Sequence, residues 1–112
     1  MAMKVHGLSH CGTTREAIVE LREAGHAPQL RDVRADKLSR AELQRFMDKL
    51  GDKLLNRASL TWRGLSAEEQ SGDPIDLILK HDALMKRPVI EDGDTLSMGW
   101  TANVKRAWNV PV

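Results

Sequence analysis

The order of apolar and polar positions predicts alternating strands and helices in the first half of the chain. Residues 3–8 (MKVHGL) and 27–34 (APQLRDVR) are short strand candidates. Between them, residues 13–25 place Ile18 and Leu21 on one face of a predicted helix, which glycine ends. Two strands joined through a helix are expected to lie parallel in one sheet.

Two capping boxes predict helix starts in the middle of the chain. In each, a serine is followed three residues later by a glutamate: Ser39 with Glu42, and Ser66 with Glu69. The first opens an apolar stripe that runs to Leu50, and this is the most regular helical pattern in the sequence. Residues 52–65 show no clear period.

The last third of the chain predicts a helix, a hairpin and a final helix. Asp73-Pro74 is typical of a helix start, with aspartate as the cap and proline in the first turn. Residues 87–99 (RPVIEDGDTLSMG) read as a hairpin with an Asp-Gly turn at 92–93. Thr101 then caps a helix that reaches Trp108.

Composition bounds the class of protein. The chain has 112 residues, 41% of them apolar and 29% charged, which fits one globular domain. A net charge of +1 gives no argument for direct binding of nucleic acid or of a membrane surface. No apolar run approaches the roughly 20 residues of a membrane helix, and the N-terminus lacks the pattern of a secretory signal. One cysteine excludes an internal disulfide, so we expect a cytoplasmic protein.

That cysteine, Cys11, stands where the first predicted strand ends and a helix begins, in "LSHCGTTRE". The free N–H groups and the dipole of a helix N-terminus favour a thiolate and can also hold an oxyanion. Gly12, Thr13 and Thr14 supply backbone and hydroxyl donors, and Arg15 adds positive charge. The alternative is that Cys11 is a small buried apolar residue, as free cysteines often are.

The histidines offer no better chemistry. Neighbouring strand residues point to opposite faces, so His10 is poorly placed as a base for Cys11, and surface positions are favoured for His6 and His10. No spacing of histidine and cysteine supports a metal site. The three tryptophans are interpreted as packing between the sheet and the middle helices.

Arg87-Pro88 is the second informative stretch. Proline suits the first position of a strand, but X-Pro is also the common place for a cis bond. A cis turn here would bring Arg87 beside the thiol loop, where its planar guanidinium can pair with a thiolate or an anionic substrate.

Four stretches stand in this order along the chain: "HCGTTR", "LLNRASLTWRGL", "LILKHDALMKRPVIED" and "MGWTANVKRAW". Together they resemble the ArsC/Spx/YffB family related to arsenate reductases, over nearly the whole chain. The resemblance implies a thioredoxin-like α/β fold, whose element order matches the one predicted above. It implies one domain over residues 1–112, with a helical insert at about 39–82 before the final hairpin and helix.

The resemblance also implies roles for individual residues. Cys11 falls on the nucleophilic or redox cysteine, and Arg87, beside Pro88, falls on an arginine that binds the oxyanion in arsenate reductases. A second arginine of those enzymes falls on Asn56, with Arg57 adjacent as a substitute, and a third falls on Gly99. A histidine that precedes the cysteine falls on Gly7. These losses argue against arsenate as the substrate.

The implied function is a thiol oxidoreductase with one active cysteine, which depends on an outside thiol. The family implies glutathione as the co-substrate, or glutaredoxin as the protein donor, and no tightly bound cofactor. The alternative is an Spx-like regulator that binds a protein such as RNA polymerase and has no reductase activity. Thr14 stands where many Spx proteins have a second cysteine, so that switch is absent here.

Overall fold

The structure is a computed structural model that describes residues 3–112. It divides into two compact units, one formed by the chain up to Asp36 together with Arg87–Val112, the other by Lys37–Lys86.

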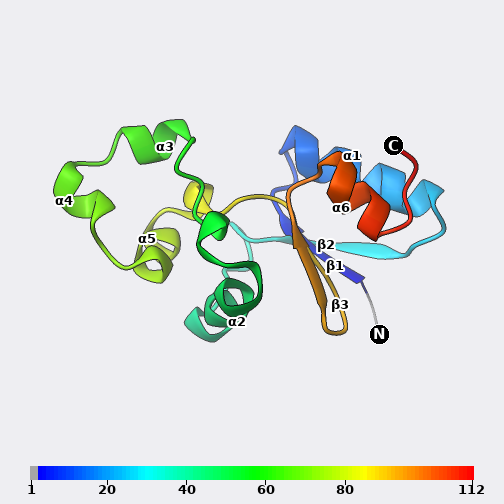
Figure 1. Cartoon of the computed structure of the whole chain (residues 1–112), viewed down its shortest axis with the longest axis horizontal. Helices are drawn as coiled ribbons and strands as arrows, with labels where there is room; N and C mark the ends of the chain where they lie inside the picture. The colour runs from blue at the N-terminus through cyan, green and yellow to red at the C-terminus, as the bar shows by residue number, and fades with distance from the viewer. Residues whose placement is uncertain (1–2) are drawn as a thin grey trace. The chain divides into compact units, whose positions relative to one another are not determined.

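A four-stranded sheet forms the first unit, with the strand order β2-β1-β3-β4. Its elements are β1 (Met3–Gly7), α1 (Gly12–Glu23), β2 (Pro28–Asp32), β3 (Val89–Asp92), β4 (Thr95–Met98) and α6 (Ala102–Ala107). As predicted, β1 and β2, which precede and follow α1 in the chain, pair in parallel with each other. β3 pairs antiparallel with both β1 and β4 (Figure 1).

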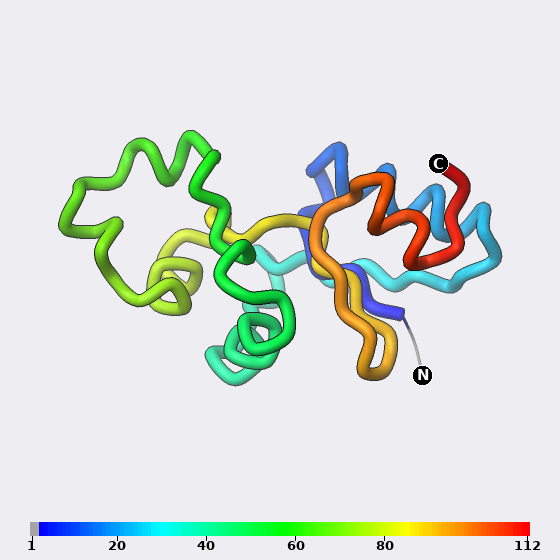
Figure 2. The backbone as a smooth tube through the Cα atoms, in the orientation of Figure 1, coloured from blue at the N-terminus to red at the C-terminus, as the bar shows by residue number. Residues whose placement is uncertain are grey.

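The core of this unit lies on the sheet face that α1 and α6 cover. Val5 of β1 and Ile90 of β3 pack there with Ile18 and Leu21 of α1. The C-terminal segment returns alongside α1 (Figure 2), where Val110 joins the same cluster. The helical stripe predicted for α1 therefore faces the core, as an amphipathic helix requires.

Trp100 and Trp108 belong to this core, which corrects the prediction that they pack between the sheet and the middle helices. Each buried indole N–H has a partner within the unit. Trp100 Nε1 donates to Glu20 at 2.8 Å, and Trp108 Nε1 donates to Ser97 Oγ at 2.8 Å. These partners explain the placement, because a buried indole needs an acceptor for its N–H group.

The β3–β4 hairpin is present, but its turn is shifted by one residue from the prediction. Asp92 pairs with Thr95, so the two loop residues are Gly93 and Asp94. Gly93 has φ of 60°, and Asp94 does not have a positive φ. A glycine at the first central position is the pattern of a type II′ turn, which matches the twist of the flanking strands.

Helices make up the second unit. They are α2 (Arg40–Leu50), a 3₁₀ turn (Asp52–Leu54), α3 (Leu60–Arg63), α4 (Ala67–Gln70), α5 (Pro74–Lys80) and a second 3₁₀ turn (Asp82–Leu84). Both capping boxes are confirmed, since Ser39 with Glu42 and Ser66 with Glu69 exchange the expected hydrogen bonds. The Asp73 side chain accepts from the N–H of Ile75 and so caps α5.

The core of the second unit joins α2 and α5. Phe46 of α2 is fully buried, and Ile75 and Ile78 of α5 are also buried. The two 3₁₀ turns are tied by backbone bonds, from Asn56 N–H to Leu84 O at 2.7 Å and from Lys86 N–H to Leu54 O at 2.8 Å. An ion pair between Arg40 and Asp76 joins the surfaces of α2 and α5.

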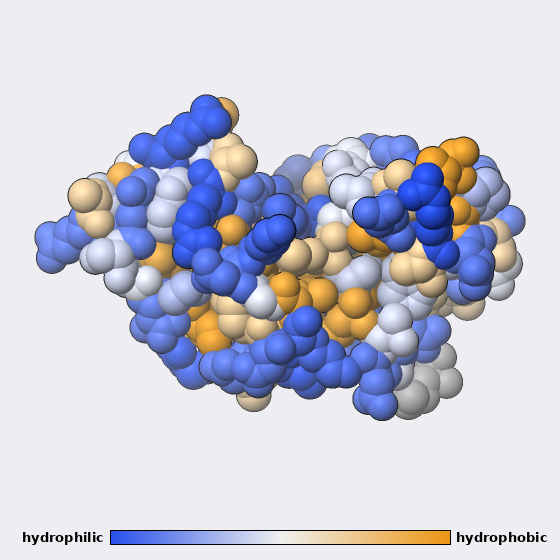
Figure 3. Space-filling view, in the orientation of Figure 1, coloured by the Kyte–Doolittle hydropathy of each residue, from blue (hydrophilic) through white to orange (hydrophobic). Residues whose placement is uncertain are grey.

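Hydrophilic residues cover most of the face drawn in Figure 3. The large apolar side chains that remain exposed among residues 3–112 are few, with Leu60 of α3 the most exposed at 82%. Within the same described range, no helix is both long and apolar enough to cross a membrane.

Candidate active site around Cys11

Cys11 is the N-cap residue of α1 (φ −79°, ψ 120°), in the short loop that leaves β1. Its own N–H donates to Leu8 O at 3.0 Å, and its carbonyl accepts from Arg15 N–H at 3.0 Å. No side-chain oxygen caps the first turn of α1. The sulfur therefore stands where a serine or aspartate oxygen usually accepts hydrogen bonds from the first helical turn.

The surroundings of Cys11 lower the pKa of its thiol. Partial burial opposes ionisation and raises that pKa, but hydrogen-bond donors outweigh this effect. They are the hydroxyl and backbone N–H of Thr14, the guanidinium of Arg87 and the backbone N–H of Thr13. A thiolate is the nucleophilic form of cysteine, so this arrangement favours a reactive sulfur.

Thr14 faces the sulfur from a fully buried position, and Gly7 makes that position possible. A Cβ built on Gly7 would lie 2.7 Å from Thr14 Cγ2 and closer still to Thr14 Oγ1. A Cβ on Gly12 would meet nothing within 4 Å. The close approach at this loop therefore depends on Gly7 and not on Gly12.

We expect Gly7→Ala to destabilise the protein by about 1–3 kcal/mol, the usual cost of forcing atoms into a packed core. Displacing Thr14 should also raise the Cys11 pKa. Urea unfolding and the pH dependence of alkylation measure the two effects. The matched control is Gly12→Ala, expected to stay within about 0.5 kcal/mol of the wild type. Equal effects of the two substitutions would contradict the close contact between Gly7 and Thr14.

Arg87 is held next to Cys11 with much of its hydrogen-bonding capacity unused. The Arg87-Pro88 bond is cis, as the sequence allowed, and Pro88 is buried. Arg87 is half-buried, and its Nε and Nη1 atoms are buried with no hydrogen-bond partner among the described residues. Buried donors are nearly always satisfied in folded proteins. Two unsatisfied donors next to the thiol therefore call for an explanation, and a role in the chemistry of the site is one.

Two other predicted anion-binding arginines differ from Arg87. Arg15 is exposed and, with Gly12, lines a hollow of about 480 Å³ along α1. Arg57 belongs to the second unit, where it pairs with Asp52 at 2.8 Å and lies over the Trp62 ring at 5.4 Å. Both of its observed partners come from that unit, so its guanidinium is already engaged.

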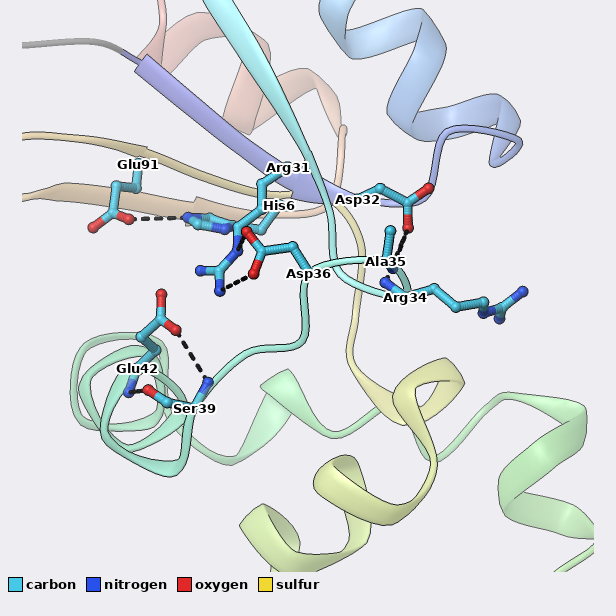
Figure 4. Close-up of polar contacts among 9 residues, drawn as sticks. All are labelled: His6, Arg31, Asp32, Arg34, Ala35, Asp36, Ser39, Glu42 and Glu91. Carbon is cyan, nitrogen blue, oxygen red and sulfur yellow. Dashed lines mark hydrogen bonds and ion pairs between the residues drawn. The ribbon is translucent and has the colours of Figure 1, made fainter.

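The structure corrects the prediction for His6, which is buried and not at the surface. His6 Nε2 lies 2.9 Å from Glu91 Oε1 of β3 (Figure 4). Because strand residues alternate between faces, His6 points away from the core that contains Val5. No local pattern could reveal this partner, which is 85 residues away in the chain. His10 is exposed, as predicted.

Sequence reasoning also missed Asp32, whose carboxylate binds the thiol loop. It accepts a hydrogen bond from Ser9 N–H at 3.1 Å. An Asx turn over residues 32–35 was the available local signal. That turn explains two of the carboxylate's bonds but not the one to Ser9.

The ArsC family model matches residues 6–107. An uncharacterized protein of Haemophilus influenzae is 32% identical over 100 residues, which are 82% of this chain and 86% of that protein. The solved structure of a protein named YFFB is 28% identical, with a TM-score of 0.87 over 95% of this chain and 97% of that one.

Two further solved structures are similar. An arsenate reductase (ArsC) related protein from Brucella melitensis is 28% identical and has a TM-score of 0.76, covering 97% of this chain and 95% of its own. An arsenate reductase from Vibrio cholerae has a TM-score of 0.78 at 17% identity, over 99% and 98% of the two chains, and shows the shared fold. The predicted thioredoxin-like α/β fold is confirmed, and with the family model matched over nearly its full length the chain belongs to the ArsC family.

Proposed function

We propose that this protein is a thiol oxidoreductase that works with Cys11 alone and takes its reducing electrons from an external thiol. The observation that carries the proposal is the set of donors around the sulfur. Thr13, Thr14 and Arg87 all lower the pKa of Cys11, against the opposing effect of burial. A lowered pKa raises the fraction of thiolate at a given pH, and the thiolate is the species that attacks in thiol–disulfide exchange.

The chemistry follows from there being one cysteine in the chain. The Cys11 thiolate attacks one sulfur of a mixed disulfide between glutathione and a second thiol. A new S–S bond forms between Cys11 and glutathione, and the second thiol leaves as a thiolate. A free glutathione thiolate then attacks this adduct, which releases the Cys11 thiolate and gives oxidised glutathione. One disulfide is reduced and one is formed, so electrons balance.

Glutathione is supported as the reductant by the charge of the site. Its carboxylates can pair with the half-buried Arg87 guanidinium, since a guanidinium binds carboxylates through its fork of N–H groups. Arg15, exposed one turn into α1, lines a hollow that also contains Glu16, Glu20 and Glu23, so the positive charge that matters at the thiol comes from Arg87. A glutaredoxin could fill the same role as a protein donor.

Arsenate is not the substrate we propose. Gly99 has φ of 78°, a conformation that non-glycine residues rarely adopt, so an arginine is disfavoured at that position. The Asn56 side chain accepts from Ala58 N–H at 3.2 Å and closes a local turn. With Arg57 engaged by Asp52, the anion-binding set is reduced to Arg87 and the helix amides.

The pH dependence of alkylation tests the proposal. The rate for folded wild type should reach half its maximum at a pH clearly below about 8.5, the value of a free cysteine. The rate then falls as pH drops through the lowered pKa, because protonation removes the nucleophile. The same protein unfolded in urea is the control and should titrate near about 8.5. A folded protein that titrates like the unfolded one would overturn the proposal.

A substrate panel then separates the candidate reactions. Glutathione mixed disulfides, small symmetrical disulfides and arsenate are each supplied with reduced glutathione, with and without glutaredoxin. We expect turnover of the mixed disulfides and little with arsenate. Turnover of arsenate alone would place the protein among the arsenate reductases.

A further inference from the structure

Asp32 connects the end of β2 to the loop that carries the reactive thiol. It is the last residue of β2, and the parallel register sets it opposite Gly7, the last residue of β1. Val33 N–H donates to Gly7 O at 2.9 Å, which holds the two strand ends together. The thiol loop starts from this junction, so whatever holds the junction also sets the direction of the loop.

The carboxylate serves two loops at once. Asp32 Oδ2 accepts from Ser9 N–H at 3.1 Å, while Oδ1 accepts from Arg34 N–H at 2.9 Å and from Ala35 N–H at 3.3 Å. Figure 4 shows Asp32 between the loop that leaves β1 and the turn after β2. Hydrogen bonds from the Ser9 hydroxyl and N–H, then from Arg34 and Ala35, lower the pKa of Asp32 to about 2. The Asp32 side chain is therefore a carboxylate at neutral pH and at the mildly acidic pH of the alkylation experiments below.

The bond to Ser9 acts on a short and otherwise well-held segment. Leu8 is buried, and its carbonyl accepts a hydrogen bond from Cys11 N–H, so the residues on both sides of Ser9 are held in place. His10 is exposed, with its Nε2 3.4 Å from Arg34 Nη1. Loss of the bond from Ser9 N–H to Asp32 would therefore release the backbone two residues before Cys11.

We propose that Asp32 is a positioning residue for Cys11. Its bond to Ser9 holds the loop so that the sulfur stays within reach of the donors on Thr13, Thr14 and Arg87. The inference rests on the proposed function, because it takes Cys11 as the reacting thiol.

The negative charge of Asp32 and its positioning role predict opposite shifts of the Cys11 pKa when Asp32 is neutralised, so the direction of the shift tests the proposal. A carboxylate near a thiol disfavours the thiolate, so neutralising Asp32 without moving the loop would lower the Cys11 pKa. Loss of positioning would raise it, because the sulfur would lose its donors. The two accounts therefore differ in the direction of the shift.

Asp32→Asn separates the bond from Ser9 N–H from the two that close the turn. The asparagine oxygen can still accept from Arg34 and Ala35, but its NH₂ group would face Ser9 N–H and cannot accept from it. The Ser9 hydroxyl, which donates to Asp32, would have to turn to accept from that NH₂ group. The control is Asp36→Asn, which removes the same charge from a nearby residue whose side chain is 73% exposed and pairs with Arg31. Alkylation is measured against pH for the wild type and both variants.

We expect Asp32→Asn to raise the Cys11 pKa and to slow alkylation at pH 6 by about 3- to 10-fold, since one pKa unit changes the thiolate fraction tenfold. Asp36→Asn should leave the profile unchanged or shift it slightly lower. An unchanged or lowered pKa in Asp32→Asn would overturn the positioning role. An unshifted wild-type thiol would instead overturn the proposed function, so the two failures are distinct.

Asp32→Ser provides a second route if Asp32→Asn folds poorly. Its hydroxyl can support the turn at Arg34 but is too short to reach Ser9 as well. Near-ultraviolet circular dichroism establishes that each variant is folded before alkylation is measured. If both variants fail to fold, the carboxylate holds the fold and not the thiol, which also contradicts the proposal.

Discussion

Cys11→Ser is expected to abolish reductase turnover, by at least roughly 10³-fold, because removal of a nucleophile costs that much or more. A serine hydroxyl stays protonated at neutral pH and forms no disulfide. Glutathione oxidation with a mixed-disulfide substrate measures the loss of rate. Mass spectrometry of the intact protein should show a glutathione adduct on the wild type and none on the variant.

The fold should survive this change, which makes the result interpretable. Serine is a better N-cap than cysteine, and its oxygen can accept from the same Thr13 and Thr14 amides that face the sulfur. The free energy of unfolding should therefore be equal to or up to about 1 kcal/mol above that of the wild type. Turnover that persists in a folded Cys11→Ser protein would remove Cys11 from the mechanism.

Arg87→Met is expected to cost about 10²-fold in reductase kcat/KM, the scale of losing one preorganised donor to a developing anion. The guanidinium lowers the Cys11 pKa, so its removal should also raise that pKa. Methionine has a similar length and no charge. Steady-state kinetics and alkylation against pH give the two numbers.

The thermal stability of Arg87→Met should not fall along with its activity. Nε and Nη1 of Arg87 are buried without partners in the described residues, and an unpaired buried donor costs free energy. Replacing it with an apolar chain should leave the melting temperature unchanged or raise it. Arg87→Lys keeps the charge without the fork and should retain part of the activity. A variant that is both less stable and fully active would show that Arg87 is structural.

Local signals predicted most of the fold. Both capping boxes, the Asp73 cap and the stripe of α2 depend on residues within a few positions of one another, and the structure has each of them. The hairpin shows the limit of such signals. Asp92-Gly93 suggested a turn with aspartate first, yet Asp92 pairs with Thr95 of β4 and so belongs to β3.

The candidate site depends more on distant contacts. Cys11 and Arg87 could be named from their own neighbours in sequence, but the space that Gly7 leaves for Thr14 could not. The partners of His6 and Ser9 lie 85 and 23 residues away. No period or motif in one sequence links such positions, because the sheet register brings them together.

The placement of the tryptophans gives the molecule built-in optical reporters. The chain has no tyrosine, so its near-ultraviolet absorption and emission come almost entirely from three indoles. Trp100 and Trp108 are buried in the sheet unit, whereas Trp62 is half-buried under Arg57 in the helical unit. Trp62→Phe would leave a fluorescence signal from the sheet unit alone. Subtracting it from the wild-type signal would isolate the helical unit, so events at each can be followed without any attached dye.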